Sequence, residues 1–200
     1  MTPLTISVLV SAVVLLGLWL SWVTANRLDR LHRKVAASRA AMDTQLVRRA
    51  SSAAELAASG ALDPVTAVLV AEAAWAALRA GGLGGEELRE LVPELAPAAG
   101  NAVEGQDPPD RELAESELSR TLRTALEDAD EVADIRADAV GEECLDALAA
   151  AWYRVQLARR FHNEAVSQAR RVRRKVLVRL LRLAGHAPWP VTTEIDDGWP

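Results

Sequence analysis

The chain begins with a long apolar run, residues 4–23, which spans 20 positions without a charged side chain. An α-helix rises about 1.5 Å per residue, so this run makes a helix of about 30 Å, the thickness of the hydrocarbon core of a bilayer. Trp19 and Trp22 stand in its last turn, where indole rings favour the headgroup region. The run predicts a single membrane-spanning helix.

A cleaved signal peptide is the alternative interpretation of this run. Val23, Thr24 and Ala25 provide the small residues of a cleavage site. However, no Lys or Arg precedes the apolar run, and the run is longer than the core of a usual signal peptide. We therefore expect residues 1–25 to be a transmembrane anchor.

The basic residues around the span predict its orientation. None precedes it, whereas five follow within about 20 residues, namely Arg27, Arg30, Arg33, Lys34 and Arg39. The first four of these are expected at the membrane surface. The positive-inside rule then places the N-terminus outside and the rest of the chain in the cytoplasm. The chain has only two Lys against many Arg, which indicates a GC-rich gene, and we expect a bacterial cell membrane.

The composition after the anchor predicts an all-α protein. Phe and Tyr occur once each, and alternating β-branched runs are absent. Apolar periodicity and breaker residues predict helices over about 26–58, 63–80, 110–128 and 139–183, with a turn or a frayed segment at 130–138. The N-terminal transmembrane helix is expected to continue into the first of them, and the four to form an antiparallel up-down four-helix bundle. Residues 26–185 would be this cytoplasmic bundle, irregular over 81–109, and residues 186–200 a polar tail without periodicity.

Individual apolar positions are expected to face the core of this bundle. In the second helix these are Val65, Val68, Leu69, Trp75 and Leu78, and Pro64 after the N-cap Asp63 marks its start. The third helix is expected to bury Leu113, Leu118, Leu122 and Ala125.

Charge is strongly segregated along the chain. The net charge is −5, yet residues 61–150 sum to −15 and residues 151–185 to +9. In an up-down bundle the basic end of the last helix returns to the basic start of the first, and both face the anionic inner leaflet. Each Lys or Arg there contributes about 1 kcal/mol. The expected contact residues of this end are Arg171, Arg174, Lys175, Arg179 and Arg182.

Polar residues also interrupt the apolar seams of the two long helices. Asp43 lies 16 residues after Arg27, about 24 Å along a helix, and a similar distance back from residue 183 reaches residues 163–167. We therefore expect a polar network within the bundle that sets the helix register, or else a ligand or partner groove. Its expected members are Asp43, Gln45, Arg49, Arg159, His162 and Asn163.

Two segments resemble the LemA family of membrane proteins. Residues 26–49 contain Asn-Arg-Leu-Asp-Arg-Leu after the span and end in Asp43-Thr-Gln-Leu-Val-Arg-Arg49, which looks like the family's signature after its membrane helix. Arg159-Arg-Phe-His-Asn-Glu-Ala-Val166 is similar to a stretch in the family's last helix, and residues 114–118 fit the start of its third. His162 replaces an aromatic residue of the family pattern, a following Phe-Pro is absent, and residues 81–109 diverge. The resemblance implies a helical bundle behind one membrane helix, without an established catalytic activity.

Enzymatic motifs are not evident in the chain. The three His residues are far apart, no Gly-Lys-Ser/Thr follows the Gly-rich residues 81–85, and no nucleophile elbow occurs. We expect no catalytic residue, no metal and no cofactor. Nucleic acid is not an expected partner, because the basic helix interleaves its Arg with aliphatic residues. The prediction is a non-catalytic scaffold at the inner leaflet that binds anionic lipids and a protein of unknown identity. The alternative is a regulatory subunit of a membrane-proximal protease or phosphatase complex.

Overall fold

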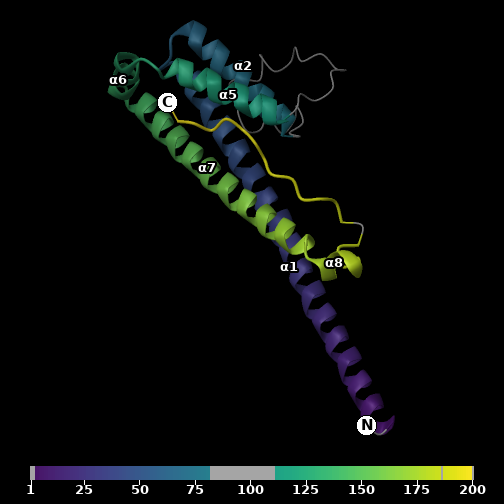
Figure 1. Ribbon diagram of the computed structural model, residues 1–200. Coiled ribbons are helices and arrows are strands. Elements are labelled where there is room, and N and C mark those ends of the chain that lie inside the picture. The colour runs from purple at the N-terminus through teal and green to yellow at the C-terminus, as the bar shows by residue number, and fades with distance from the viewer. Residues whose placement is uncertain (1–2, 82–110, 186, 200) are drawn as a thin grey trace. The chain divides into compact units, whose positions relative to one another are not determined.

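The computed structural model describes residues 3–81, 111–185 and 187–199. These residues form helices and no strand, which confirms the all-α prediction for this part of the chain (Figure 1). The helices are α1 (Pro3–Ala58), α2 (Pro64–Ala80), α5 (Arg111–Ala125), α6 (Ala129–Ala137), α7 (Ala139–Arg173) and α8 (Val176–Leu180). The predicted irregular stretch lies, apart from Gly81, outside the described residues.

The chain divides into two compact units, and α1 and α7 each contribute to both. Unit 1 contains Met1–Arg39 and Phe161–Thr192, and unit 2 contains Ala40–Arg160 and Thr193–Pro200. The predicted division into anchor, bundle and tail is of another kind and stays a prediction.

α1 is continuous through the apolar run and the basic segment after it, as predicted. Its side chains from Leu4 to Leu20 are all exposed, and it is the one helix among the described residues that is long and apolar enough to cross a membrane. The hydroxyls of Ser21 and Thr24 donate to the carbonyls of Gly17 and Leu20, at 2.8 and 2.7 Å. These polar groups are therefore satisfied within the helix, which a lipid environment requires.

Unit 1 packs the basic part of α1 against the end of α7. Leu28 is buried with Val172 and with Val178 of α8 in a small apolar cluster. Farther along α1, the Lys34 ammonium donates to Gln168 at 3.2 Å, and the Ser38 hydroxyl lies 3.1 Å from His162 Nδ1. Along this contact the residue numbers rise on α1 from 28 to 38, while those of the partner residues on α7 fall from 172 to 162.

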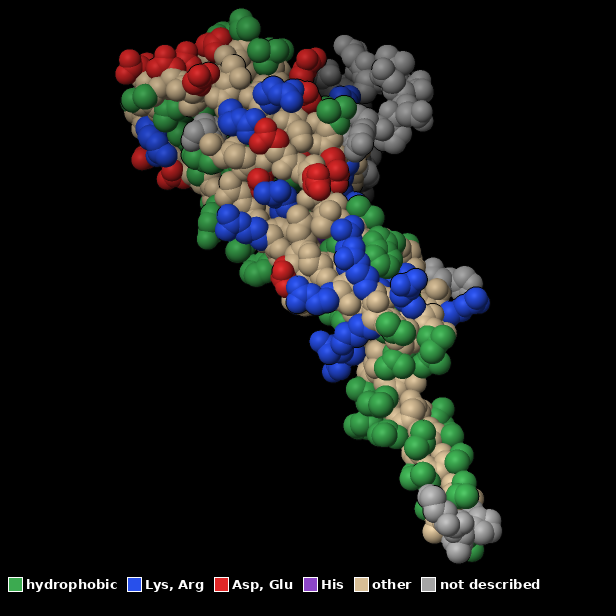
Figure 2. All heavy atoms as spheres, viewed as in Figure 1, with side chains coloured by type: hydrophobic (Ala, Val, Ile, Leu, Met, Phe, Trp, Pro, Cys, Tyr) green, Lys and Arg blue, Asp and Glu red, His purple; other side chains and the backbone are tan. Residues whose placement is uncertain are grey.

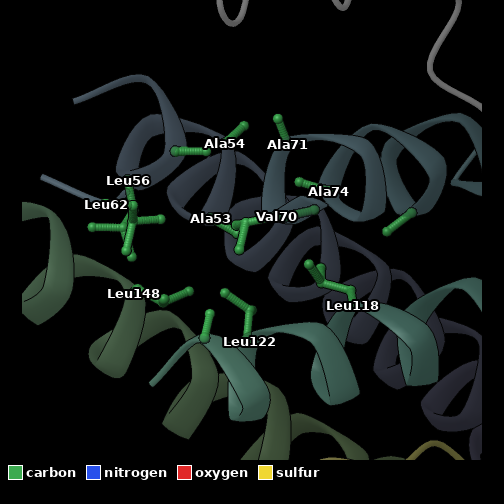
Figure 3. Close-up of a cluster of buried hydrophobic side chains, with 14 of the residues drawn as sticks. Ala53, Ala54, Leu56, Leu62, Val70, Ala71, Ala74, Leu118, Leu122 and Leu148 are labelled. Atoms are coloured by element: carbon green, nitrogen blue, oxygen red, sulfur yellow. The ribbon is translucent and has the colours of Figure 1, made fainter. Parts of the chain in front are cut away.

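The larger core belongs to unit 2 and joins α1, α2, α5, α6 and α7. In Figure 3 its side chains point toward one another from four of these helices and from Leu62 in the α1–α2 loop. Many members are Ala, including Ala53, Ala54 and Ala74, so the helices approach closely and larger Leu side chains fill the remaining space. Leu148 of α7 and Leu122 of α5 are fully buried there.

Local signals fixed the start of α2 but not its buried face. The Asp63 carboxylate accepts from the backbone N–H of Val65 and of Thr66, as an N-cap should. Three predicted core positions are nevertheless exposed: Val65, Val68 and Leu69. The buried face instead contains Val70, Ala71, Ala74, Ala77 and the correctly predicted Trp75 and Leu78. Leu113 of α5 is also exposed, contrary to prediction.

Two boundary predictions are wrong. Residues 129–137 form helix α6 with Asp128 as N-cap, where a turn was expected. The predicted helix over residues 139–183 ends at Arg173, and Lys175 is the N-cap of the separate short helix α8. After this break Val178 packs into the small core of unit 1, while Val176 and Leu180 are exposed.

The last segment has a burial pattern that was not predicted for the polar tail. Residues 193–199 form neither helix nor strand and run along the helices as an open chain (Figure 1), and Thr193, Ile195 and Asp197 are buried at alternate positions. This alternation is that of an extended chain lying on a surface.

Candidate functional site

The surface of unit 1 next to the apolar run is basic. All the predicted membrane-interface residues are exposed: Trp19, Trp22, Arg27, Arg30, Arg33, Lys34, Arg171, Arg174, Lys175, Arg179 and Arg182. Figure 2 shows hydrophobic side chains along the N-terminal part of α1 and Lys and Arg side chains gathered where that part ends. Because Leu28 packs against Val172 and Val178, basic residues from both ends of the chain belong to this same surface.

Apolar side chains accompany these cations. Val176, Leu177 and Leu180 of α8 are 77%, 51% and 74% exposed, next to exposed Arg179. Exposed aliphatic groups among cations are typical of segments that lie in a membrane interface. α8 therefore presents both a cationic and several aliphatic side chains to solvent.

Two Arg of α7 serve a different purpose in unit 1. Arg170 Nε donates to the carbonyl of Pro190 at 2.8 Å, and Arg173 Nη2 donates to that of Ala187 at 2.9 Å. The Arg173 guanidinium also lies over the Trp189 ring, 4.9 Å from its centre. Burial, followed by the charge of Arg173, lowers the pKa of His32, so His32 adds no charge to this surface at neutral pH.

Unit 2 contains a buried cluster of charged residues. Arg49 of α1 is 0% exposed, and its Nη2 donates to Glu115 Oε2 of α5 at 2.8 Å. Its Nη1 donates to the Ser119 hydroxyl at 2.9 Å, and its guanidinium lies 5.0 Å from the centre of the Trp152 ring of α7. Burial raises the pKa of Glu115, although the charge and hydrogen bond of Arg49 oppose the shift.

A second, more exposed ion pair adjoins this cluster. Arg111 Nη1 lies 3.2 Å from Asp43 Oδ1, and Arg111 Nε lies 3.9 Å from Glu115 Oε1. Asp43 and Arg49 on α1 are thus matched by residues of α5. Two cations and two carboxylates balance one another, so the cluster is formally neutral.

The segment after residue 192 packs against Trp152 of α7. The carbonyl of Asp197 accepts from Trp152 Nε1 at 2.8 Å and from Gln156 Nε2 at 2.7 Å. Its carboxylate accepts two hydrogen bonds from Arg159, at 2.7 and 2.8 Å. The Trp199 ring meets Trp152 edge-on, with ring centres 5.2 Å apart.

The predicted polar network therefore divides into separate contacts. Asp43 and Arg49 have their partners on α5, rather than on residues 159–167 of α7, and Arg159 pairs with Asp197. His162 Nδ1 contacts Ser38, its Nε2 lies 3.3 Å from the carbonyl of Val191, and Asn163 is half-buried on the same helix. Gln45 Oε1 is buried and accepts no hydrogen bond among the described residues.

Sequence reasoning missed the partners of these residues. Glu115 and Ser119 lie 66 and 70 positions from Arg49, so no local pattern relates them. For the last segment no local signal was available, because buried Asp197 and exposed Asp196 are neighbouring residues of the same type.

No group of three or more His, Cys, Asp or Glu placed to hold a metal ion occurs within residues 3–81, 111–185 and 187–199. Burial raises the pKa of the Cys144 thiol, and nearby Glu55 and Glu143 add to the shift, so the thiol is held in its less reactive form. A pocket of about 460 Å³ lies between α5 and Trp199 and is lined in part by Arg120, Arg123 and Glu127.

No family model, curated protein or solved structure matches this chain.

Proposed function

We propose that the protein is a membrane-anchored scaffold of the LemA type, in which a single transmembrane helix leads into an antiparallel helical bundle on the cytoplasmic face of a bacterial membrane. The bundle binds anionic lipids through the basic surface of unit 1 and holds a protein partner near the inner leaflet. The function is interaction rather than catalysis.

The observation that supports this proposal best is the joining of two basic segments at the end of the apolar run. The cluster of Leu28, Val172 and Val178 brings residues about 145 positions apart to the same level of α1, within about two helical turns of the end of the span. The opposite order of residue numbers in the α1–α7 contacts is what an antiparallel pair gives. The cations on both segments are exposed, so they are available to lipid headgroups.

Vesicle binding tests the lipid part of the proposal. A fragment of residues 26–200 lacks the span, so any membrane affinity must come from the surface. We expect salt-sensitive binding to vesicles with anionic lipids and little binding to neutral vesicles. The test variant replaces Arg171, Arg174, Lys175 and Arg179 with Gln. At about 1 kcal/mol each, the loss reaches up to about a thousandfold at low salt.

A matched control removes the same charge elsewhere. Arg48, Arg79, Arg136 and Arg154 are exposed in unit 2, and their joint replacement by Gln should leave vesicle binding nearly unchanged. Circular dichroism must first show that both variants keep the helical content of the parent fragment. Equal losses in both variants would contradict a specific role for the basic surface.

A fusion experiment tests the orientation. Alkaline phosphatase attached after residue 200 of the full chain should be inactive in bacterial cells, because the positive-inside rule keeps this end in the cytoplasm. Strong phosphatase activity would place it outside and would remove the inner leaflet from the proposal.

A further inference from the structure

The segment Thr193–Trp199 is held in unit 2 as a protein ligand would be. Its contacts with α5 and α7 are made by side chains and by its own backbone. Thr193, Ile195 and Asp197 face inward, and Glu194 and Asp196 face outward. Ile195 is buried against Met42, Leu46 and Val155. An extended chain with alternate residues in pockets is a common form of bound peptide.

Three residues on one face of α7 recognise Asp197. Trp152, Gln156 and Arg159 follow at intervals of four and three positions, so they lie along one stripe of the helix. Trp152 and Gln156 donate hydrogen bonds to the backbone carbonyl of Asp197, and Arg159 donates to both oxygens of its carboxylate. Arg–carboxylate contacts of this two-pronged kind combine strength with geometric selectivity. Asn at position 197 would lose that charge while keeping the shape.

Two residues of α5 recognise the neighbouring positions. Arg123 Nη1 donates to Asp196 Oδ1 at 2.9 Å and to the Gly198 carbonyl at 3.2 Å. The Asp196 N–H donates to the Ser116 hydroxyl at 3.2 Å. The surface of α5 and α7 therefore binds two consecutive carboxylates and the Gly that follows them, and Trp199 packs against Trp152.

We propose that this surface of α5 and α7 is a binding site for an extended acidic segment of a partner protein, and that Thr193–Trp199 occupies it as an intramolecular substitute. The partner segment would have two consecutive carboxylates followed by a small residue and an aromatic residue. Arg123 and Arg159, which pair with Asp196 and Asp197, make this surface complementary in charge to such a segment. This inference rests on the proposed role as an interaction protein and identifies where the partner binds.

Intramolecular occupation explains how such a site is regulated. A tethered segment acts at an effective concentration of about millimolar, so it excludes weak ligands and yields to a strong or abundant one. Displacement breaks no covalent bond, and the partner segment would take over the contacts that Thr193–Trp199 makes with Trp152 and Arg159.

Peptide binding to the full chain in detergent micelles tests the proposal. The probe is a fluorescent peptide of residues 193–199, and binding is followed by anisotropy. In the variant Asp197→Lys, the introduced ammonium faces Arg159 and should unseat the tethered segment. We expect this variant to bind the peptide at least tenfold more tightly than the unmodified chain does, because its site is free.

Three controls make the result specific. Glu194→Lys makes the same charge change at an exposed position of the same segment, and it should bind the peptide as weakly as the unmodified chain. Adding Arg159→Glu to Asp197→Lys should abolish binding, and so should a peptide with Asn at position 197. If Asp197→Lys binds no better than Glu194→Lys, the proposal is wrong.

A second measurement avoids variants that fail to fold. Millimolar unlabelled peptide added to the unmodified chain should speed hydrogen exchange at the amide of Asp196, which now bonds to Ser116. Unchanged exchange would overturn the proposal. Neither measurement uses lipid, so a failure here leaves the vesicle result standing, and a failure of vesicle binding leaves the peptide result standing.

Discussion

Replacing Arg49 by Met should destabilise unit 2 more than any surface substitution. The Arg49 side chain is 0% exposed and Glu115 is 1% exposed, so removing the cation leaves a carboxylate without its main partner inside the core. Ser119 loses a hydrogen-bond donor, and Trp152 loses the cation over its ring.

The magnitude follows from the burial of this pair. Breaking a buried ion pair by removing one partner costs about 3–5 kcal/mol, because the remaining charge is desolvated. For a chain of this size, 1 kcal/mol corresponds to about 2–4 °C, so the melting temperature should fall by about 6–20 °C. Replacing both Arg49 and Glu115 by Met removes both charges, and the double variant should recover most of the loss.

Thermal unfolding of the full chain in nanodiscs, followed by circular dichroism, measures this effect. The matched control is Arg48→Met, which changes an exposed neighbour in the same way and should shift stability by at most about 0.5 kcal/mol. The two single variants and the double variant form a cycle that isolates the energy of the pair.

The pH dependence gives a second signature. Burial already raises the pKa of Glu115, and loss of Arg49 raises it further, so the folded variant keeps a proton that the unfolded chain has released. The stability of Arg49→Met should therefore fall as pH rises from about 4.3, the ordinary pKa of Glu, through the raised folded value. The deficit relative to the unmodified chain should be smaller at pH 5 than at pH 8. A melting temperature equal to that of Arg48→Met would refute the buried pair.

Three further predictions concern other parts of the chain. Gly141→Ala should lower stability by about 1–3 kcal/mol in urea unfolding, because the added Cβ would lie 2.3 Å from the Ile135 carbonyl oxygen, which is backbone and has little freedom to move. Asp63→Ala should lower the melting temperature by removing the N-cap of α2, and Asp63→Asn, which also caps, should retain most of it. The hydrogen bond from Arg123 lowers the pKa of Asp196. This contact is therefore present above the ordinary pKa of Asp and is lost as pH falls through the lower pKa of the folded state. Hydrogen exchange at the Asp196 amide, corrected for intrinsic rates, should be faster at pH 3 than at pH 6.

Local sequence signals predicted the helices whose ends are marked by capping or helix-breaking residues. The absence of Pro and of further Gly after Gly17 made α1 continuous to Ala58, and Gly60, with φ +80°, follows its end. Asp63 and Pro64 fixed the start of α2. By contrast, α6 was predicted as a turn, because its nine residues include three acidic ones and show little apolar periodicity.

The buried faces were harder to predict than the helices. Val65, Val68 and Leu69 are more apolar than the Ala residues that are buried on α2, yet they are exposed. Close helix contact favours small side chains, and which face makes that contact depends on the position of α5 and α7. A ranking of residues by hydrophobicity lacks this information.

The sequence by itself determined the all-α composition, the apolar span at the start of α1 and the basic residues that follow it, because these depend on local hydropathy, charge and helix propensity. Only the tertiary structure decided that Arg49 pairs with Glu115 and that Asp197 lies on Arg159. Those contacts join residues 66 and 38 positions apart. Their free energy exists only after the helices have packed and excluded water, so a charged residue destined for the core and one destined for solvent look the same in the sequence.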